Sequence, residues 1–189
     1  MNLDIIMPSN VKMILNKIKE NKHEAVIVGG CVRDSIMEYM PHDWDIATSA
    51  QPTEIIEIFK DFRIMTAGLK HGTVTIIIDH EPYEITTYRV DGKYTDYRRP
   101  DTVSYTRNLA EDLLRRDFTI NAIAYDGENI IDLHGGVDDI ENKIIRCVGN
   151  PDDRFREDPL RILRALRFAV RFKFKIEEST ATAMRKHMG

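Results

Sequence analysis

A pair of glycines at the end of an apolar run constrains the fold of this chain more than any other feature. Residues 24–28 are rich in Val, which predicts a strand, and they lead directly into Gly29 and Gly30. Residues 31–40, which follow, are compatible with a helix. Glycines permit close backbone approach and a helix N-terminus favours negative charge, so this turn could receive a phosphate group. The alternative is a plain strand-to-helix turn that needs small residues.

Two carboxylates follow the predicted helix at a spacing of two residues. Asp43 and Asp45 flank Trp44 in residues 43–47, which we expect to form a strand. Both carboxylates would then point to one face of the strand, while Trp44 packs on the other. Mg²⁺ prefers oxygen ligands, and two ions roughly 3.5–4 Å apart suit phosphoryl or nucleotidyl transfer. Beside an anion-binding turn, the pair indicates a site for Mg²⁺ and a triphosphate, although an isolated Asp-x-Asp is usually a surface loop.

Two further residues could complete such a site. Glu84 lies in residues 83–89, a β-rich segment, and could supply a third carboxylate that positions an attacking hydroxyl or a second ion. An exposed strand glutamate is the alternative. Arg33, in the first turn after the glycines, could reach a phosphate or a ribose hydroxyl, while Asp34 would cap or pair locally.

Residues 115–122, Arg-Arg-Asp-Phe-Thr-Ile-Asn-Ala, place charged side chains in an otherwise apolar region. A buried charge must be paired or used. Arg116 could therefore bind a triphosphate or a sugar, while Asp117 and Asn121 hold the local geometry. A purely structural ion-pair network is the alternative.

A third group of charges follows near the C-terminal end. Asp158, Arg161, Arg164 and Arg167 recur every three residues, which predicts a stripe on one helix. Cytosine and adenine each present an amino donor beside a ring-nitrogen acceptor, whereas uracil and guanine reverse that pattern. An Asp acceptor beside an Arg donor could therefore select C and A, leaving the other arginines for phosphates. An ordinary salt-bridged surface helix is the alternative.

The chain divides near residue 149. We expect helices at residues 10–22 and 137–142, another after Pro52 with Thr53 as N-cap, and strands at residues 73–78, 129–133 and 143–148. Residues 109–124 begin as a helix, and residues 90–106 have the composition of a mobile loop. Gly149-Asn150-Pro151 marks a boundary, after which the pattern is purely helical. The sequence therefore predicts a mixed α/β head at residues 1–149 and a helical region at residues 150–189.

Overall composition adds only broad limits. The net charge of −4 does not indicate a nucleic-acid binder, but residues 154–175 hold eight basic residues against two acidic ones. That surplus could attract a polyanion or form a solvated helix face. Cys31 and Cys147 lack metal-ligand spacing and predict reduced thiols in a cytoplasmic protein. No apolar run approaches the roughly 18 residues of a membrane span, so no membrane association is expected.

Together these segments resemble the tRNA nucleotidyltransferase/poly(A) polymerase family of the DNA polymerase β superfamily, specifically the bacterial-type (class II) CCA-adding enzymes. The resemblance is carried, in the family's order, by residues 28–34 (VGGCVRD), 42–48 (HDWDIAT), 84–89 (EITTYR), 115–122 (RRDFTINA) and 157–161 (EDPLR). It implies an α/β nucleotidyltransferase head followed by the start of a helical neck, without the family's body and tail.

The resemblance also implies roles for single residues. Those that it places in contact with the nucleotide are Gly29, Gly30, Arg33 and Arg116. It makes Asp43 and Asp45 the ligands of catalytic Mg²⁺ in a two-ion site. It makes Asp158 and Arg161 a protein template for C and A, with Arg164 and Arg167 nearby. The implied reaction is attack of a tRNA 3′-hydroxyl on the α-phosphate of CTP or ATP, which releases pyrophosphate and needs no protein nucleophile. We infer no protein partner.

Residues 90–106, which include Arg98-Arg99-Pro100, match the flexible loop that the family links to the switch from CTP to ATP. The presence of this loop favours full CCA addition. Three alternatives remain. A poly(A) polymerase or A-adding enzyme would share the fold. A non-catalytic nucleotide- or RNA-binding module would tolerate loss of Asp43 and Asp45. A small-molecule nucleotidyltransferase would not need Asp158 and Arg161.

Overall fold

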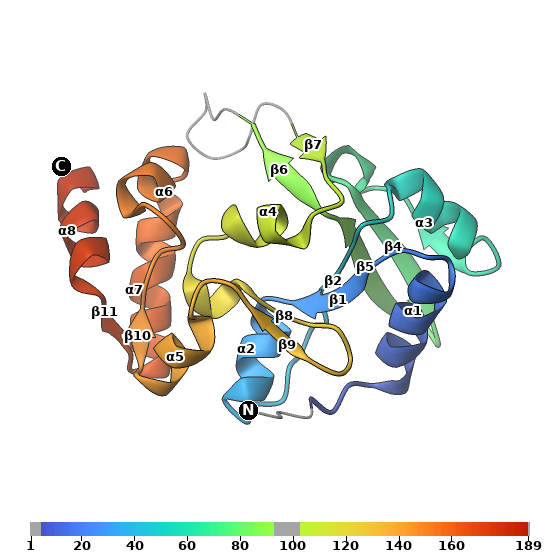
Figure 1. Cartoon of the computed structure of the whole chain (residues 1–189), viewed down its shortest axis with the longest axis horizontal. Coiled ribbons are helices and arrows are strands. Elements are labelled where there is room, and N and C mark those ends of the chain that lie inside the picture. Colours follow the sequence, from blue (N-terminus) through green and yellow to red (C-terminus); the bar gives the residue numbers. More distant parts are fainter. Residues whose placement is uncertain (1–4, 93–102, 189) are drawn as a thin grey trace.

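Figure 1 shows the computed structural model of the chain, which describes residues 5–92 and 103–188. A seven-stranded sheet with the order β3-β4-β5-β2-β1-β8-β9 lies at its centre. The strands are β1 (Ala25–Val28), β2 (Ile46–Thr48), β3 (Arg63–Met65), β4 (Thr73–Ile78), β5 (Glu81–Thr87), β8 (Ile123–Tyr125) and β9 (Ile130–Asp132). β2 and β5 run parallel, and the other neighbours run antiparallel. The predicted strands of this sheet are thus confirmed.

Helices cover both faces of the sheet. α1 (Ser9–Glu20), α2 (Gly30–Ile36) and α3 (Pro52–Ile58) pack on one face, and α4 (Leu109–Leu114) packs on the other (Figure 1). Successive strand residues point to opposite faces. Ile27 of β1 therefore joins the larger apolar cluster beneath α1, whereas Val26 and Val28 join a smaller cluster with Leu113 of α4. The central strands are buried on both faces, as their continuous apolar runs predict.

A second group of helices stands at the end of the molecule away from α3 (Figure 1). It consists of α5 (Gly136–Glu141), α6 (Pro151–Glu157), α7 (Leu160–Phe172) and α8 (Glu178–His187). β10 (Ile144–Ile145) pairs in parallel with β11 (Lys175–Ile176), so a strand follows the predicted boundary and the expectation of a purely helical end is wrong. Within the described ranges, no helix is both long and apolar enough to cross a membrane.

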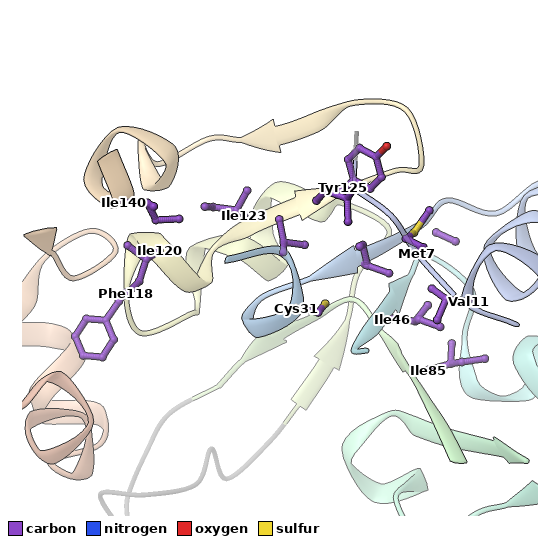
Figure 2. Packing of buried hydrophobic residues seen from close by; sticks show 14 of the residues in the cluster. Met7, Val11, Cys31, Ile46, Ile85, Phe118, Ile120, Ile123, Tyr125 and Ile140 are labelled. Atoms are coloured by element: carbon purple, nitrogen blue, oxygen red, sulfur yellow. The ribbon is translucent and has the colours of Figure 1, made fainter. Parts of the chain in front are cut away.

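One apolar core joins the two groups. Figure 2 shows it running from Met7 and Ile46 through Tyr125 and Ile123 to Phe118. The Phe118 ring then meets Phe168 of α7 edge-to-face, with ring centroids 5.9 Å apart. The head and the helical region therefore share buried surface across residue 149, and we expect them to unfold together.

Several predicted boundaries moved for local reasons. β2 begins at Ile46 rather than at residue 43, so the two aspartates precede the strand. α2 ends at Ile36, and Glu38 takes a φ of +60°, which a helix cannot continue through. The N-cap of α3 is Gln51 rather than Thr53, because the Gln51 N–H donates to Glu54 Oε2 at 2.7 Å in a capping box.

The predicted mobile loop begins and ends in paired strands. β6 (Arg89–Asp91) and β7 (Val103–Tyr105) form an antiparallel ribbon at its two ends. The rest of the loop, with Arg98-Arg99-Pro100, lies outside the described residues. Two single-turn helices, η1 (Leu69–His71) and η2 (Thr119–Asn121), complete the described elements.

Gly136 is expected to be indispensable for packing α5 against η2. A Cβ at Gly136 would lie 2.2 Å from the backbone oxygen of Thr119, a fixed atom. Gly136→Ala should therefore lower the free energy of unfolding by about 3 kcal/mol in urea denaturation. Gly149→Ala is the control: Gly149 has a φ of +68° but open space around it, so about 1 kcal/mol is expected. Equal losses in the two variants would contradict this account.

Candidate active site

The glycine turn brings the end of β1 against the segment that follows α4. Gly29 has a φ of +81°, a conformation that side chains other than glycine rarely adopt. A Cβ there would also lie 3.1 Å from a terminal nitrogen of Arg116 and 3.7 Å from the backbone oxygen of Asn121. Gly29 is thus needed twice, once for the turn and once for the close approach of the arginine.

The two aspartates lie beside this turn. The Val28 N–H donates to the Asp45 carbonyl at 3.0 Å, which continues the β1–β2 pairing one step beyond β2. Ala47 packs in the smaller cluster, on the α4 face, while Trp44 packs against the larger cluster on the opposite face. Asp43 and Asp45 are both exposed, and they lie close enough together for Asp43 to act on the charge of Asp45. Trp44 thus packs against the core as predicted, and a shared face for the two carboxylates stays a prediction.

Glu84 lies on the neighbouring strand, as predicted. Ile46 of β2 pairs with Ile85 of β5 in parallel, so Glu84 stands next to Asp45 in register. Glu84 is exposed. Among the described residues, however, no three His, Cys, Asp or Glu side chains are grouped closely enough to hold a metal ion. The described protein atoms therefore offer a metal ion two carboxylates, and a role for Glu84 stays a prediction.

The electrostatics of the pair favour a bound cation. The surrounding protein desolvates Asp45 and raises the pKa of its carboxyl; Arg116 opposes this rise and Asp43 adds to it. Asp45 is therefore held near a like charge, in a place where ionisation costs free energy. A divalent cation between the two oxygen donors would remove that cost.

Arg116 lies over the glycine turn with part of its guanidinium uncommitted. One terminal nitrogen donates to Asp112 Oδ2 at 3.2 Å. The buried Nε has no hydrogen-bond partner among the described residues. A buried donor without a partner is costly, and such a donor beside two carboxylates and a glycine turn suits an anionic ligand.

Arg33 is held by several partners. Its side chain is buried, and its nitrogens donate to Asp34 Oδ1, at 2.8 and 2.6 Å, and to Asn121 Oδ1. The guanidinium carbon lies 5.2 Å from the ring centroid of Phe168 and 4.8 Å from that of Phe172, both on α7. Arg33 therefore links α2 to α7. One of its terminal nitrogens lies 3.6 Å from the position of a Cβ on Gly30, beside the glycine turn, and its contact with a nucleotide stays a prediction.

Asp117 and Asn121 extend this contact, in the structural role that the sequence predicts. The Asn121 amide donates to Asp117 Oδ1 at 3.1 Å, and Arg164 Nε donates to Asp117 Oδ2 at 2.7 Å. Asp117 is buried, so the charge-assisted bond from Arg164 compensates its desolvation. These bonds fix α7 against the segment that carries Arg116.

The predicted stripe of four charged residues on one helix is wrong at Asp158. α6 ends at Glu157, and Asp158 is extended, with φ −147° and ψ 99°. Pro159 disfavours a helical conformation in the residue before it. The Asp158 side chain accepts the Leu160 N–H at 2.9 Å, so Asp158 lies at the break where α7 begins.

The arginines of α7 differ in exposure. Arg161 is buried and donates to Glu157 Oε2 at 2.6 Å and to the backbone oxygen of Arg154 at 3.2 Å. Arg164 and Arg167 are exposed. The structure therefore pairs Arg161 with Glu157, a residue that the sequence analysis did not select. The acidic neighbour four residues before Arg161 was the available signal.

This geometry defines a class of protein: a mixed α/β nucleotidyltransferase head, with paired carboxylates beside a glycine turn. The chain belongs to the family described as the poly A polymerase head domain, whose model matches residues 25–146. The family assignment that the sequence motifs predict is thus confirmed.

Curated relatives are consistent with this assignment. The chain is 51% identical over 172 residues to the CCA-adding enzyme of Enterococcus faecalis, covering 90% of this chain and 42% of that protein. It is 52% identical over 172 residues to the CCA-adding enzyme of Oceanobacillus iheyensis, with the same coverage of 90% and 42%. The chain therefore spans less than half the length of these relatives.

Solved structures agree. The CCA-adding enzyme of Bacillus stearothermophilus in complex with CTP has a TM-score of 0.83 and 40% identity, over 94% of this chain and 43% of that chain. A CCA-adding enzyme in complex with ATP has a TM-score of 0.80 and 28% identity, over 97% of this chain and 43% of that one.

The raised pKa of Asp45 predicts a pH-dependent gain of stability on neutralisation. The folded protein binds the Asp45 proton more tightly than the unfolded chain, so ionised Asp45 destabilises the metal-free protein at neutral pH. Asp45→Asn should raise the free energy of unfolding there. The gain should disappear below the ordinary pKa of 3.8, where Asp45 is protonated in both states.

Asp126→Asn is the control with the opposite sign. Burial alone would raise the pKa of Asp126, but the N–H groups of Asn129 and Glu128 lower it. Asp126→Asn should therefore lose stability at neutral pH. Chemical denaturation of both variants across the acid range gives the measurement, and a loss of stability in Asp45→Asn at neutral pH would contradict the site electrostatics.

Proposed function

We propose that this chain forms the catalytic head and the start of the neck of a CCA-adding enzyme. In the proposed reaction, a tRNA 3′-hydroxyl attacks the α-phosphate of CTP or ATP, and pyrophosphate leaves. The observation that carries the proposal is the meeting of Asp43, Asp45 and Arg116 at the Gly29 turn. The similarity to CCA-adding enzymes that bind CTP and ATP supports this choice of substrates.

The donor set fits Mg²⁺. Asp43 and Asp45 would offer hard oxygen donors on one face. A bound cation would relieve the repulsion between their negative charges. When bound there, Mg²⁺ ions, in the two-ion arrangement that we expect, activate the attacking hydroxyl and neutralise the leaving group. Asp43 and Asp45 would hold the ions, and no protein nucleophile is required.

The other residues would bind and orient the nucleotide. We assign the triphosphate to Arg116 and to the backbone of Gly29 and Gly30, because Arg116 offers a donor that no described residue accepts. We also assign Arg33 to the nucleotide, because one of its terminal nitrogens lies beside Gly30 and its bonds to Asp34 and Asn121 fix the guanidinium there.

The start of the neck would read the base. Asp158 lies at the break before α7, and its backbone carbonyl accepts the Arg161 N–H at 3.0 Å. We assign the Asp158 carboxylate as the acceptor and the Arg161 guanidinium as the donor that the base would meet. Arg161 would have to exchange part of its bonding to Glu157 for the base. Arg164 and Arg167 add positive charge on the same helix, and we retain residues 1–149 and 150–189 as the extents of head and neck.

Two further statements belong to this proposal. The chain corresponds to 42% of the length of a CCA-adding enzyme, and phosphate contacts supply much of nucleic-acid affinity, so we expect weak binding of tRNA by this part alone. We place the reaction in the cytoplasm, in keeping with two buried free thiols, Cys31 and Cys147.

A poly(A) polymerase or A-adding enzyme on the same fold is the second candidate. The observation that favours it is the family description, which names a poly A polymerase head domain. The two functions differ in their use of CTP: an A-adding enzyme would bind ATP but hardly use CTP.

Asp43→Ala tests the catalytic assignment. Transfer of CMP from CTP to a tRNA that lacks its 3′ CCA should fall by about a hundredfold or more, because metal-mediated charge stabilisation contributes several kcal/mol. Nucleotide binding should fall only modestly, because Arg116 and the glycine turn remain. Asp61→Ala, an exposed aspartate at the end of α3, should transfer as the unaltered chain does. Full activity of Asp43→Ala would contradict the metal assignment.

A further inference from the structure

Asp112 is a buried carboxylate that binds three groups at once. Its side chain is 1% exposed on the inner side of α4. Oδ1 accepts from Arg115 Nε at 3.0 Å and from a terminal nitrogen of Arg115 at 2.9 Å. Oδ1 also accepts the backbone N–H of Arg89 at 3.2 Å, at the start of β6. Oδ2 accepts from Arg116 at 3.2 Å.

The two oxygens of Asp112 divide this work. Oδ1 links α4 to β6, because it accepts hydrogen bonds from Arg115 and from the backbone of Arg89. Oδ2 accepts a hydrogen bond from the guanidinium of Arg116. Burial alone would raise the pKa of Asp112, but Arg115, Arg116 and the Arg89 N–H lower it, so the carboxylate is ionised at neutral pH. A fixed negative charge thus holds one edge of the Arg116 guanidinium.

A second terminal nitrogen of Arg116 lies beside the glycine turn. The terminal nitrogen not bonded to Asp112 lies 3.1 Å from the position of a Cβ on Gly29. The Nε atom is buried without a partner among the described residues. Arginine has a long side chain with many rotamers, so an unheld guanidinium would seldom present these donors in one place.

We propose that Asp112 is a positioning residue, which holds the Arg116 guanidinium over the Gly29 turn so that its remaining donors meet the triphosphate. This inference rests on the proposed nucleotide site. Asp112 itself touches no substrate, and it acts through Arg116. The same carboxylate links the start of β6, and hence the β6–β7 ribbon, to the arginine above the glycine turn.

Asp112→Asn should change the affinity for CTP in opposite directions under two hypotheses: that Asp112 positions Arg116, or that Asp112 acts only through its negative charge. Asparagine keeps the shape and one acceptor but removes the negative charge. If Asp112 acted only through its charge, its removal would make the site more positive and would tighten the binding of CTP. If Asp112 positions Arg116, CTP should bind about tenfold more weakly, the value expected for losing one well-aimed charge-assisted bond.

The experiment is a double-mutant cycle read by calorimetric titration of CTP with Mg²⁺. The proteins are the unaltered chain, Asp112→Asn, Arg116→Gln and the double variant. The tenfold loss should vanish in the Arg116→Gln background, because Asp112 then has nothing to position. Asp139→Asn is the matched control: Asp139 is buried and binds Arg146 and Thr119, neither of which we assign to the nucleotide, so the CTP affinity of this variant should not change.

Each outcome decides the proposal. Tighter or unchanged CTP binding in Asp112→Asn, or the same loss in both backgrounds, would overturn it. If Asp112→Asn does not fold by circular dichroism, Asp112→Glu, which keeps the charge but shifts it by one methylene, takes its place with the same expectation. Failure of the unaltered chain to bind CTP would remove the proposed function as well, whereas the other contrary results remove this inference alone.

Discussion

The close approach at Gly29 is the constraint on which the rest of the site depends. A residue with a side chain would meet the Arg116 guanidinium at 3.1 Å and would resist a φ of +81°. Because glycine has no side chain, Gly29 tolerates both the positive φ and the close approach of Arg116, and the end of β1 can lie against the segment after α4. The bond from Val28 to the carbonyl of Asp45 then brings the paired carboxylates to the same place. Positive and negative groups from three parts of the sequence therefore converge on one backbone turn.

The segment after α4 also carries the joint to the neck. Arg154 donates to the Leu114 carbonyl at 3.2 Å, Arg161 to the Arg115 carbonyl at 3.5 Å, and Arg164 to Asp117. Carbonyls at a helix C-terminus attract cations, so the end of α4 is a natural dock for these arginines. The residues that we assign to the base and to the triphosphate are thus held by adjacent residues of one segment. A displacement of the base-reading residues should therefore also shift the residues that bind the triphosphate.

Much of the fold follows from the sequence, and the failures share a cause. The apolar runs at β1 and β4 and the helical spacing in α1 were sufficient to predict these three elements, since each buries apolar side chains in a regular pattern. The break at Asp158 was missed because spacing of charges outweighed the effect of Pro159. The contacts of Arg33 with Phe168 and Phe172 could not be predicted, because these rings are remote from Arg33 in sequence. Asp112 was missed because its partner Arg89 is brought near only by the fold, although Arg115 and Arg116 lay at helical spacing.

The central claim is that this chain alone forms a triphosphate site whose neighbouring neck residues select the base. Calorimetric titration of the chain with CTP, ATP, UTP and GTP in the presence of Mg²⁺ tests it most directly, because the measurement needs no tRNA. The account predicts comparable affinities for CTP and ATP, with UTP and GTP weaker by about tenfold or more, since buried polar groups left unpaired discriminate strongly. Equal affinity for all four nucleotides, or binding of none, would contradict it.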